Sequence, residues 1–139
     1  MIVLAGLEIQ RTIAELNLKQ MGKDELIWNL RLGIHSGELI TGVVGKQKFA
    51  YDIWGDTVNT ASRMESAGEV GKVNISGSTY NIIKDFFECT FRGHIMVKNK
   101  GDIDMYFVER IKPEYSAGKK GTEPNDKFHT YLDNLDKLL

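Results

Sequence analysis

The sequence has one cysteine, two prolines and no long apolar run in 139 residues. A single thiol, Cys89, cannot form an intrachain disulfide, which favours a reducing compartment, and we interpret it as a small core residue. No stretch approaches the ~20 apolar residues that cross a bilayer, and the apolar start of the chain lacks the cleavage site of a signal peptide. A net charge of −1 gives no overall basic field for a nucleic acid. These absences predict a soluble, cytoplasmic domain with no membrane segment and no nucleic-acid partner.

Hydrophobic periodicity indicates where the first helix and strand lie. Residues 2–21 have apolar side chains at helical spacing, and Gly22 is typical of a helix stop. This apolar stripe consists of Ile2, Ala5, Ile9, Ile13 and Leu16. From Trp28 to His35 the period changes to two, which predicts a strand with one buried face. That face would consist of Trp28, Leu30, Leu32 and Ile34.

The middle of the chain alternates between predicted strands and helices. Strands at 39–44 and 49–54, joined by a short polar link, predict a hairpin. A helix should then extend from Asp56, as its N-cap, to about Ala67. The later elements are predicted as strand 72–76, helix 78–87, strand 89–98 and strand 103–111. This alternation predicts an α+β fold, an α/β sandwich.

The composition changes after Pro113. Residues 113–126 are rich in Gly, Lys, Glu and Pro, which indicates a linker. Apolar residues at helical spacing follow and predict a short amphipathic helix that docks on this domain or on a partner. We therefore divide the chain into a domain at 1–112, a linker at 113–126 and a helix at 127–139.

The segment YDIWGDTVNTASRMES, residues 51–66, contains the most informative polar pattern. Asn59 and Arg63 are four apart in the predicted helix, so they share one face. The guanidinium of Arg63 suits phosphate oxygens, and the Asn59 amide can both donate and accept. Asp52, near the end of the preceding strand, could accept a hydrogen bond from the exocyclic amine of a purine. Spacing alone leaves the alternative of a solvated helix face open.

Three ordered segments resemble the class III adenylate and guanylate cyclases. They are LRLGIHSGELITGVVG, the YDIWGDTVNTASRM part of residues 51–66, and FRGHIMVKNKGDIDMYFVE. They follow one another in the family's order over about residues 1–111, which is far more specific than a single glycine motif. The resemblance implies the ferredoxin-like catalytic core of this family, without its first strand or strands.

The resemblance also implies roles for five residues. Asp52 matches the position that accepts a hydrogen bond from the adenine amino group. Asn59 matches the residue that orients the ribose and its 3′ oxygen, and Arg63 the residue that stabilises charge on the phosphate. Lys98 matches the lysine that contacts the terminal phosphate. Arg31 matches an arginine that contacts the triphosphate from the other half of the site.

Family members hold two metal ions, usually Mg²⁺ or Mn²⁺, on two aspartates that precede these segments. Asp24, Asp56 and Asp102 do not have the surroundings of those ligands. We therefore expect a truncated domain with no metal ligands of its own and no cyclase activity as an isolated chain.

The predicted function is that of an adenylate cyclase catalytic domain, which converts ATP to cyclic AMP and pyrophosphate in intracellular signalling. Asp52 favours ATP, because guanylate cyclases of the family usually have a smaller residue without a carboxylate there. The family implies a homodimer with the site at its interface, in the cytoplasm or as the cytosolic part of a membrane-attached protein. Two alternatives stay open: a guanylate cyclase, and a regulatory module that binds nucleotide or dimerises without turnover. A third, a ferredoxin-like interaction domain unrelated to cyclases, would require three ordered segments to coincide.

Overall fold

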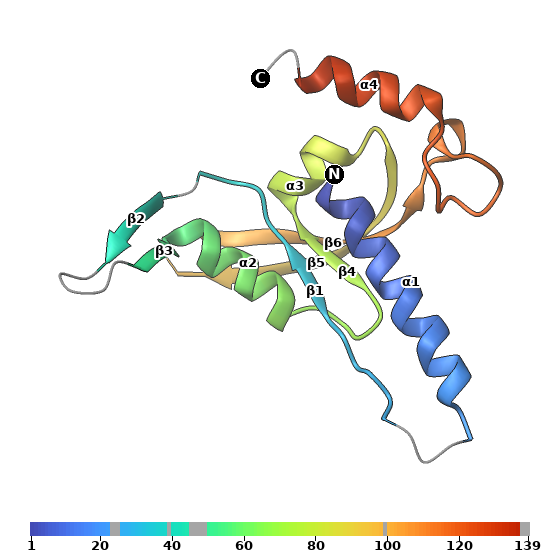
Figure 1. The fold of residues 1–139 in the computed structure, drawn as a ribbon. Helices are drawn as coiled ribbons and strands as arrows, with labels where there is room; N and C mark the ends of the chain where they lie inside the picture. Colours follow the sequence, from blue (N-terminus) through green and yellow to red (C-terminus); the bar gives the residue numbers. More distant parts are fainter. Residues whose placement is uncertain (23–25, 39, 45–49, 99, 137–139) are drawn as a thin grey trace.

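A computed structural model describes the chain except for residues 23–25, 39, 45–49, 99 and 137–139; for residues 40–44, 50–54, 135 and 136 it describes the backbone. Four α-helices, six strands and one 3₁₀ turn lie within the described residues (Figure 1). The helices are α1 (Ile2–Gln20), α2 (Asp56–Ser66), α3 (Gly77–Ile83) and α4 (Asp126–Asp136). The strands are β1 (Leu32–Ile34), β2 (Ile40–Val44), β3 (Ala50–Trp54), β4 (Val73–Ser76), β5 (Phe87–Val97) and β6 (Gly101–Ile111). None of the described helices combines the length and the apolar character needed to cross a membrane.

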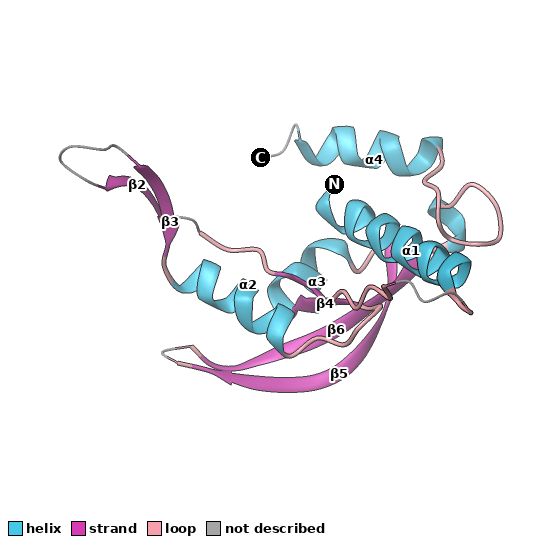
Figure 2. Cartoon of the chain, turned by 60° about the horizontal axis from the view of Figure 1, so that its bottom comes forward, coloured by secondary structure: helices cyan, strands magenta, loops and turns pink. Residues whose placement is uncertain are grey.

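Four of the strands form one sheet in the order β1-β4-β6-β5. β1 and β4 are parallel, and the other two pairs are antiparallel. β2 and β3 form a separate antiparallel hairpin, as predicted, which projects away from the four-stranded sheet (Figure 2). The mixed helix and strand architecture confirms the predicted α+β sandwich.

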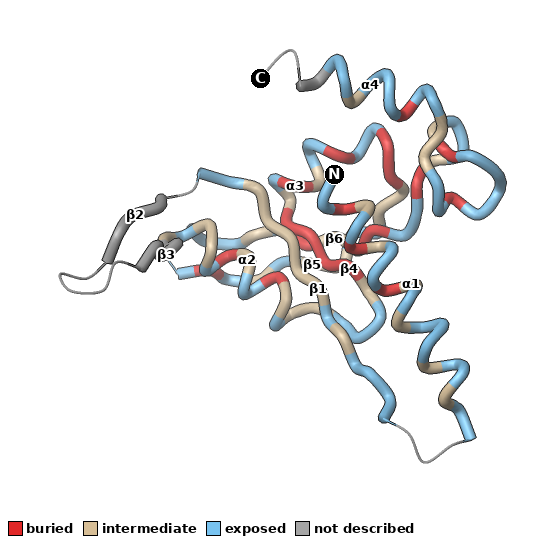
Figure 3. Tube along the Cα trace, viewed as in Figure 1, coloured by how far each residue is buried: buried red, intermediate tan, exposed pale blue. Residues whose placement is uncertain are grey.

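The central strand β4 is buried along its whole length because helices cover both faces of the sheet (Figure 3). Val73 and Ile75 face the main core, to which α1, α3 and α4 contribute Val3, Ile83 and Phe128. Asn74 faces the opposite side, where its amide donates to a carbonyl of α2. Alternation along a single strand therefore places the core on one face and α2 on the other.

The apolar stripe predicted for α1 is not the face that packs on the sheet. Val3, Gly6 and Gln10 are buried, whereas Ile2 and Ile9 of the stripe are 67% and 44% exposed. Because glycine and glutamine are not large apolar residues, apolar periodicity does not reveal this packing face. The Gln10 amide nitrogen nevertheless donates to Leu30 O and Lys72 O, which connects the helix to the segments just before β1 and β4.

The strand predicted at 28–35 is also wrong in its first half, because β1 contains only Leu32–Ile34. Its parallel partner β4 has four residues, so residues 28–30 have no strand beside them within the described sheet. Their backbone groups bond to side chains of α1 instead: Asn17 contacts both N–H and C=O of Trp28. Trp28, predicted as buried, is 52% exposed.

Two helix boundaries differ from the prediction. Asp56 is the first residue of α2 and forms no cap, because Gly55 occupies the N-cap position. α3 begins at Gly77 and ends at Ile83, before the predicted end at Phe87. Ser76 caps it by accepting a hydrogen bond from the Thr79 N–H.

Residues after Lys112 pack against the rest of the chain. Ile111 N–H donates to Gly121 O, and Ser116 pairs with Pro124 in an isolated β-bridge. Phe128 of α4 is fully buried and lies edge-on to Phe86, with ring centroids 5.4 Å apart. The division into domain, linker and tail helix stays a prediction, but these contacts tie the tail to the core.

Candidate active site

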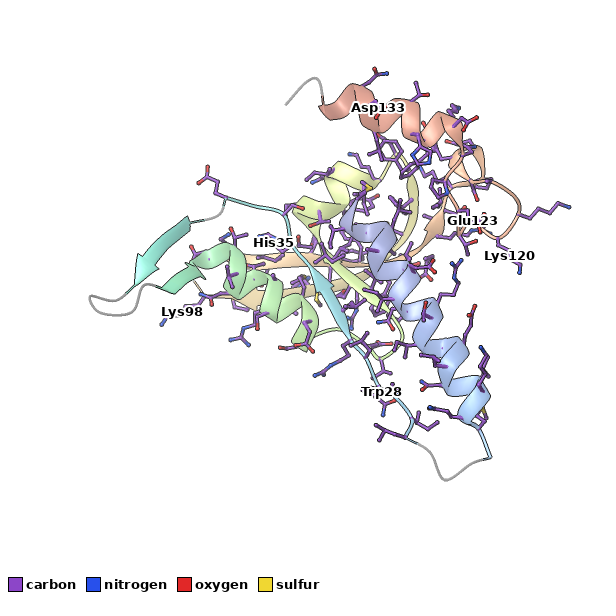
Figure 4. The ribbon with its side chains drawn as sticks, in the orientation of Figure 1. Trp28, His35, Lys98, Lys120, Glu123 and Asp133 are labelled. Carbon is purple, nitrogen blue, oxygen red and sulfur yellow. The ribbon has the colours of Figure 1, made fainter. Side chains whose placement is uncertain are left out.

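Helix α2 carries the two residues that the sequence predicts as catalytic. Asn59 and Arg63 lie on one face, one turn apart. Lys98 follows the last residue of β5 and lies beside this helix (Figure 4). All three side chains are exposed, and they line one open hollow of about 290 Å³. The structure therefore brings Asn59, Arg63 and Lys98 together, although Lys98 is distant in sequence.

Arg63 differs from the other arginines in forming no ion pair among the described residues. The other four pair with glutamates, as Arg11–Glu8, Arg31–Glu65, Arg92–Glu69 and Arg110–Glu88. Lys98 likewise has no ion pair within the described chain. Two cations that line one hollow and form no ion pair among the described residues favour an anionic ligand, and a guanidinium suits phosphate oxygens in particular.

Three further residues line the hollow that no motif in the sequence indicates: Asp56, Ser62 and Val97. Asp56 precedes Asn59 by three positions and Arg63 by seven, which is the spacing of one helix face. That spacing could have placed Asp56 in the site, but the residue was interpreted as an N-cap. Val97 is 5% exposed. The sequence pattern of its strand, β5, does not indicate that α2 would lie beside it.

Arg31 does not line this hollow. The Arg31 Nε lies 3.2 Å from Glu65 Oε1, and its Nη1 lies 3.5 Å from Ser66 O, at the carboxyl end of α2. The backbone of Asp52 lies on β3 opposite Gly42. The side chain of Asp52 lies outside the described residues, so its predicted contact with a purine stays a prediction.

The hollow does not have the composition of a metal site. Magnesium and manganese prefer several oxygen ligands, and the lining contains one carboxylate, Asp56. Among the residues that the structure describes, no three His, Cys, Asp or Glu side chains are grouped closely enough to hold a metal ion. The amide, guanidinium and ammonium donors of the lining suit an anion instead. The described residues therefore do not fit the two metal ions that the family resemblance implies.

Two other titratable side chains, His35 and Cys89, are partly buried and lie away from the hollow. His35 Nδ1 lies 2.7 Å from Ser76 Oγ, and its Nε2 is buried with no partner in the described part of the chain. Burial lowers the pKa of His35, and the nearby charge of Lys100 lowers it further. Burial, assisted by Glu109, raises the pKa of the Cys89 thiol to about 11, so this thiol is protonated at neutral pH. Neither side chain reaches the hollow beside α2.

The sequence matches the family described as the adenylate and guanylate cyclase catalytic domain over residues 2–110. An adenylate cyclase of Mycobacterium tuberculosis is 43% identical over 96 residues, which cover 68% of this chain and 22% of that protein. The chain thus spans about a fifth of the length of this curated relative.

Solved structures with the same fold include enzymes that act on either purine nucleotide. The adenylyl cyclase CyaB from P. aeruginosa is 31% identical with a TM-score of 0.69, covering 82% of this chain and 60% of that chain. The guanylate cyclase domain of RhGC from Catenaria anguillulae, solved in complex with GTP, is 43% identical with a TM-score of 0.54. That match covers 59% of this chain and 45% of the other.

Proposed function

Since the chain belongs to the adenylate and guanylate cyclase catalytic domain family, we propose that the hollow beside α2 is the ribose- and phosphate-binding half of a nucleotidyl cyclase site. In this reaction the ribose 3′ oxygen attacks the α-phosphate of the same nucleotide and pyrophosphate leaves. Asn59 would orient the ribose, Arg63 would stabilise charge that develops on the phosphate, and Lys98 would hold the terminal phosphate. The observation that carries the proposal is the convergence of these three side chains on one hollow, in which neither Arg63 nor Lys98 forms an ion pair with a described residue.

The exposure of the hollow supports an interface site. Hydrogen-bond donors stabilise a developing charge most strongly where water is excluded. Asn59, Arg63 and Lys98 are all exposed, so a second protein surface is needed to exclude water from them. We propose that this surface is another cyclase subunit in a head-to-tail homodimer. A cyclase subunit that carries metal-binding carboxylates could take the same place and supply the ligands for Mg²⁺ or Mn²⁺, which the described residues do not provide.

We propose ATP as the substrate, and the support for this is that Asp52 matches the family position that reads the purine. A carboxylate accepts a hydrogen bond from the 6-amino group of adenine, whereas the 6-oxygen of guanine offers no donor there. Asp52→Cys should therefore reduce the ratio of ATP to GTP analogue affinity. Equal affinity of the unmodified protein for both analogues would contradict the assignment and favour the guanylate cyclase alternative.

Nucleotide binding by the purified chain directly tests whether the hollow beside α2 binds the phosphates. The probe is α,β-methylene ATP, whose α,β linkage cannot be cleaved, measured by isothermal titration calorimetry. Lys98→Gln removes a cation that faces the hollow and should weaken binding by about tenfold, the usual loss for a charge-assisted hydrogen bond. Lys100→Gln, an exposed lysine of the same turn that does not line the hollow, is the matched control. Equal effects of the two substitutions would sink the assignment of Lys98.

Turnover distinguishes a catalytic half-site from a module that only binds nucleotide. The isolated chain with ATP and Mn²⁺ should form no cyclic AMP, because its described residues offer no metal-binding group of carboxylates. In an assembly with a cyclase subunit that carries those carboxylates, Arg63→Gln should lower kcat by about 10²–10³-fold. Binding without turnover in that assembly would favour the regulatory alternative.

A further inference from the structure

The carboxyl end of α2 is held by side chains from three different strand segments. The last carbonyls of a helix have no partner within it, and each needs one from elsewhere. Two of them accept from the backbone that follows: Arg63 O from the Ala67 N–H and Glu65 O from the Gly68 N–H, both at 2.9 Å. Three accept from side chains: Met64 O from Asn74, Ser66 O from Arg31 and Ala67 O from Arg92.

Arg92 makes the shortest of these side-chain contacts with the helix end. Its Nη1 donates to Ala67 O at 2.5 Å, and its Nη2 lies 3.6 Å from a carboxylate oxygen of Glu69. The guanidinium also stacks on the ring of Phe107, 4.3 Å from the centroid. A positive group at the carboxyl end of a helix interacts favourably with the helix dipole. By contrast, the contact of Arg31 with Ser66 O is long, at 3.5 Å.

The backbone of β5 is irregular at Arg92. Phe91 pairs with Tyr106 and Gly93 with Met105, so Arg92 is an extra residue that opposes nothing on β6. Gly93 has a φ of 107°, a conformation that suits glycine and permits the bulge. Bulges redirect a side chain out of the regular alternation. Here the bulge directs the side chain of Arg92 to the carboxyl end of α2.

We propose that Arg92, together with the buried Asn74, is a positioning residue for the site, a role that rests on the proposed function of the hollow. The strand that carries Arg92 ends at Val97 and leads directly to Lys98. Arg63 lies in the last turn of α2, next to the contact with Arg92. Arg92 therefore joins the two sides of the hollow and sets the distance between the guanidinium of Arg63 and the ammonium of Lys98.

A distance measurement tests this role without requiring nucleotide. Pulsed electron resonance measures the distance between α2 and β5 with spin labels at Ser62→Cys and Met96→Cys. The labelled protein carries Cys89→Ser, so that no other thiol reacts. Arg92→Gln should broaden the distance distribution at temperatures well below unfolding. Arg110→Gln, which breaks an exposed ion pair with Glu88 at the opposite end of the β5–β6 pair from Lys98, should leave it unchanged. An unchanged distribution in Arg92→Gln, or equal broadening in both variants, would overturn the proposal.

Affinity for α,β-methylene ATP, measured with unlabelled protein, is the second readout. Misplacement of Arg63 relative to Lys98 should weaken binding by about tenfold in Arg92→Gln. If Arg92→Gln does not fold, Arg92→Lys decides: one ammonium cannot match the guanidinium fork, so a distribution identical to that of the wild type refutes the role. If the wild type binds no nucleotide but Arg92→Gln broadens the distribution, the proposed function fails and the positioning role stands. If the wild type binds nucleotide but Arg92→Gln leaves the distance distribution unchanged, the proposed function stands and the positioning role fails.

Discussion

Arg31 and Arg63 show how neighbours decide the use of identical side chains. Arg31 lies beside α2 and pairs with Glu65 at the carboxyl end of the helix, whereas Arg63 belongs to α2 and lines the hollow without an ion pair to a described residue. Exposed ion pairs such as that of Arg31 contribute about 0–1 kcal/mol to stability. An unpaired guanidinium is therefore the better candidate for a ligand contact. By this criterion we propose Arg63 as a ligand contact, together with Lys98, which lines the same hollow.

His35 should make the stability of the fold depend on pH. Its pKa in the folded protein is lowered by burial and by Lys100, so the unfolded chain binds the proton more readily. The contribution of neutral His35 is fully present above about pH 6.5, the pKa of an unperturbed histidine, and is lost as the pH falls through the folded-state pKa. Urea unfolding between pH 7.5 and 5 should show this loss, and His35→Gln should remove it.

His129 is the control for this experiment, because it is exposed on α4. His129→Gln should keep the pH dependence of the wild type. A pH dependence that persists unchanged in His35→Gln would mean that another group is responsible.

Packing of α2 against β1 depends on one close approach between elements. A Cβ at Gly33 would lie 2.0 Å from Glu65 N and 2.5 Å from Met64 C, so the helix backbone occupies the space of a side chain. Backbone atoms cannot move aside as a flexible side chain can. At the scale of elements, Gly33 sets how deeply α2 lies on the sheet, while the side chains at its carboxyl end hold it there.

Gly33→Ala should displace α2 and destabilise the fold by about 3 kcal/mol, the upper range for overpacking. Equilibrium unfolding in urea measures this loss, and binding of α,β-methylene ATP should weaken with it because Asn59 and Arg63 move. Gly77→Ala is the matched control, since its Cβ would meet Asp104 Cβ at an ordinary 3.4 Å. Comparable losses in the two variants would contradict the close approach.

Over the whole molecule, the tail completes the main core. Phe128 of α4 contacts Phe86 and Phe87, which lie just before and at the start of β5. Tyr115, in the turn between β6 and α4, packs against Phe86 as well. The aromatic cluster therefore joins residues from three separate parts of the chain, and the tail stabilises the sheet that supports the site.

Phe128→Ala should cost about 3–5 kcal/mol of unfolding free energy, the usual range for a buried phenylalanine. Its exposed neighbour His129, replaced by alanine, should change stability by less than about 0.5 kcal/mol. A chain that ends at Lys112 should be destabilised at least as much as Phe128→Ala. Full stability of that shorter chain would support the predicted linker and a tail that folds separately.

The predictions that succeeded rest on local signals. The α2 segment, the β2–β3 hairpin and the face shared by Asn59 and Arg63 follow from periodicity and turn residues within a few positions. The family resemblance added Lys98, which no local pattern indicates. The predictions that failed depended on neighbours: residues 28–30 lack a strand beside them, and α1 packs through glycine and glutamine rather than through its apolar stripe.

The sequence alone determined the family, the order of most elements and the residues that define the candidate site, because these are encoded in local pattern and motif. Only the tertiary structure decided which charged residues face the hollow, because ion pairing depends on side chains that are distant in sequence. It also decided that a bulge directs Arg92 to the end of α2, since strand register arises only when β5 pairs with β6.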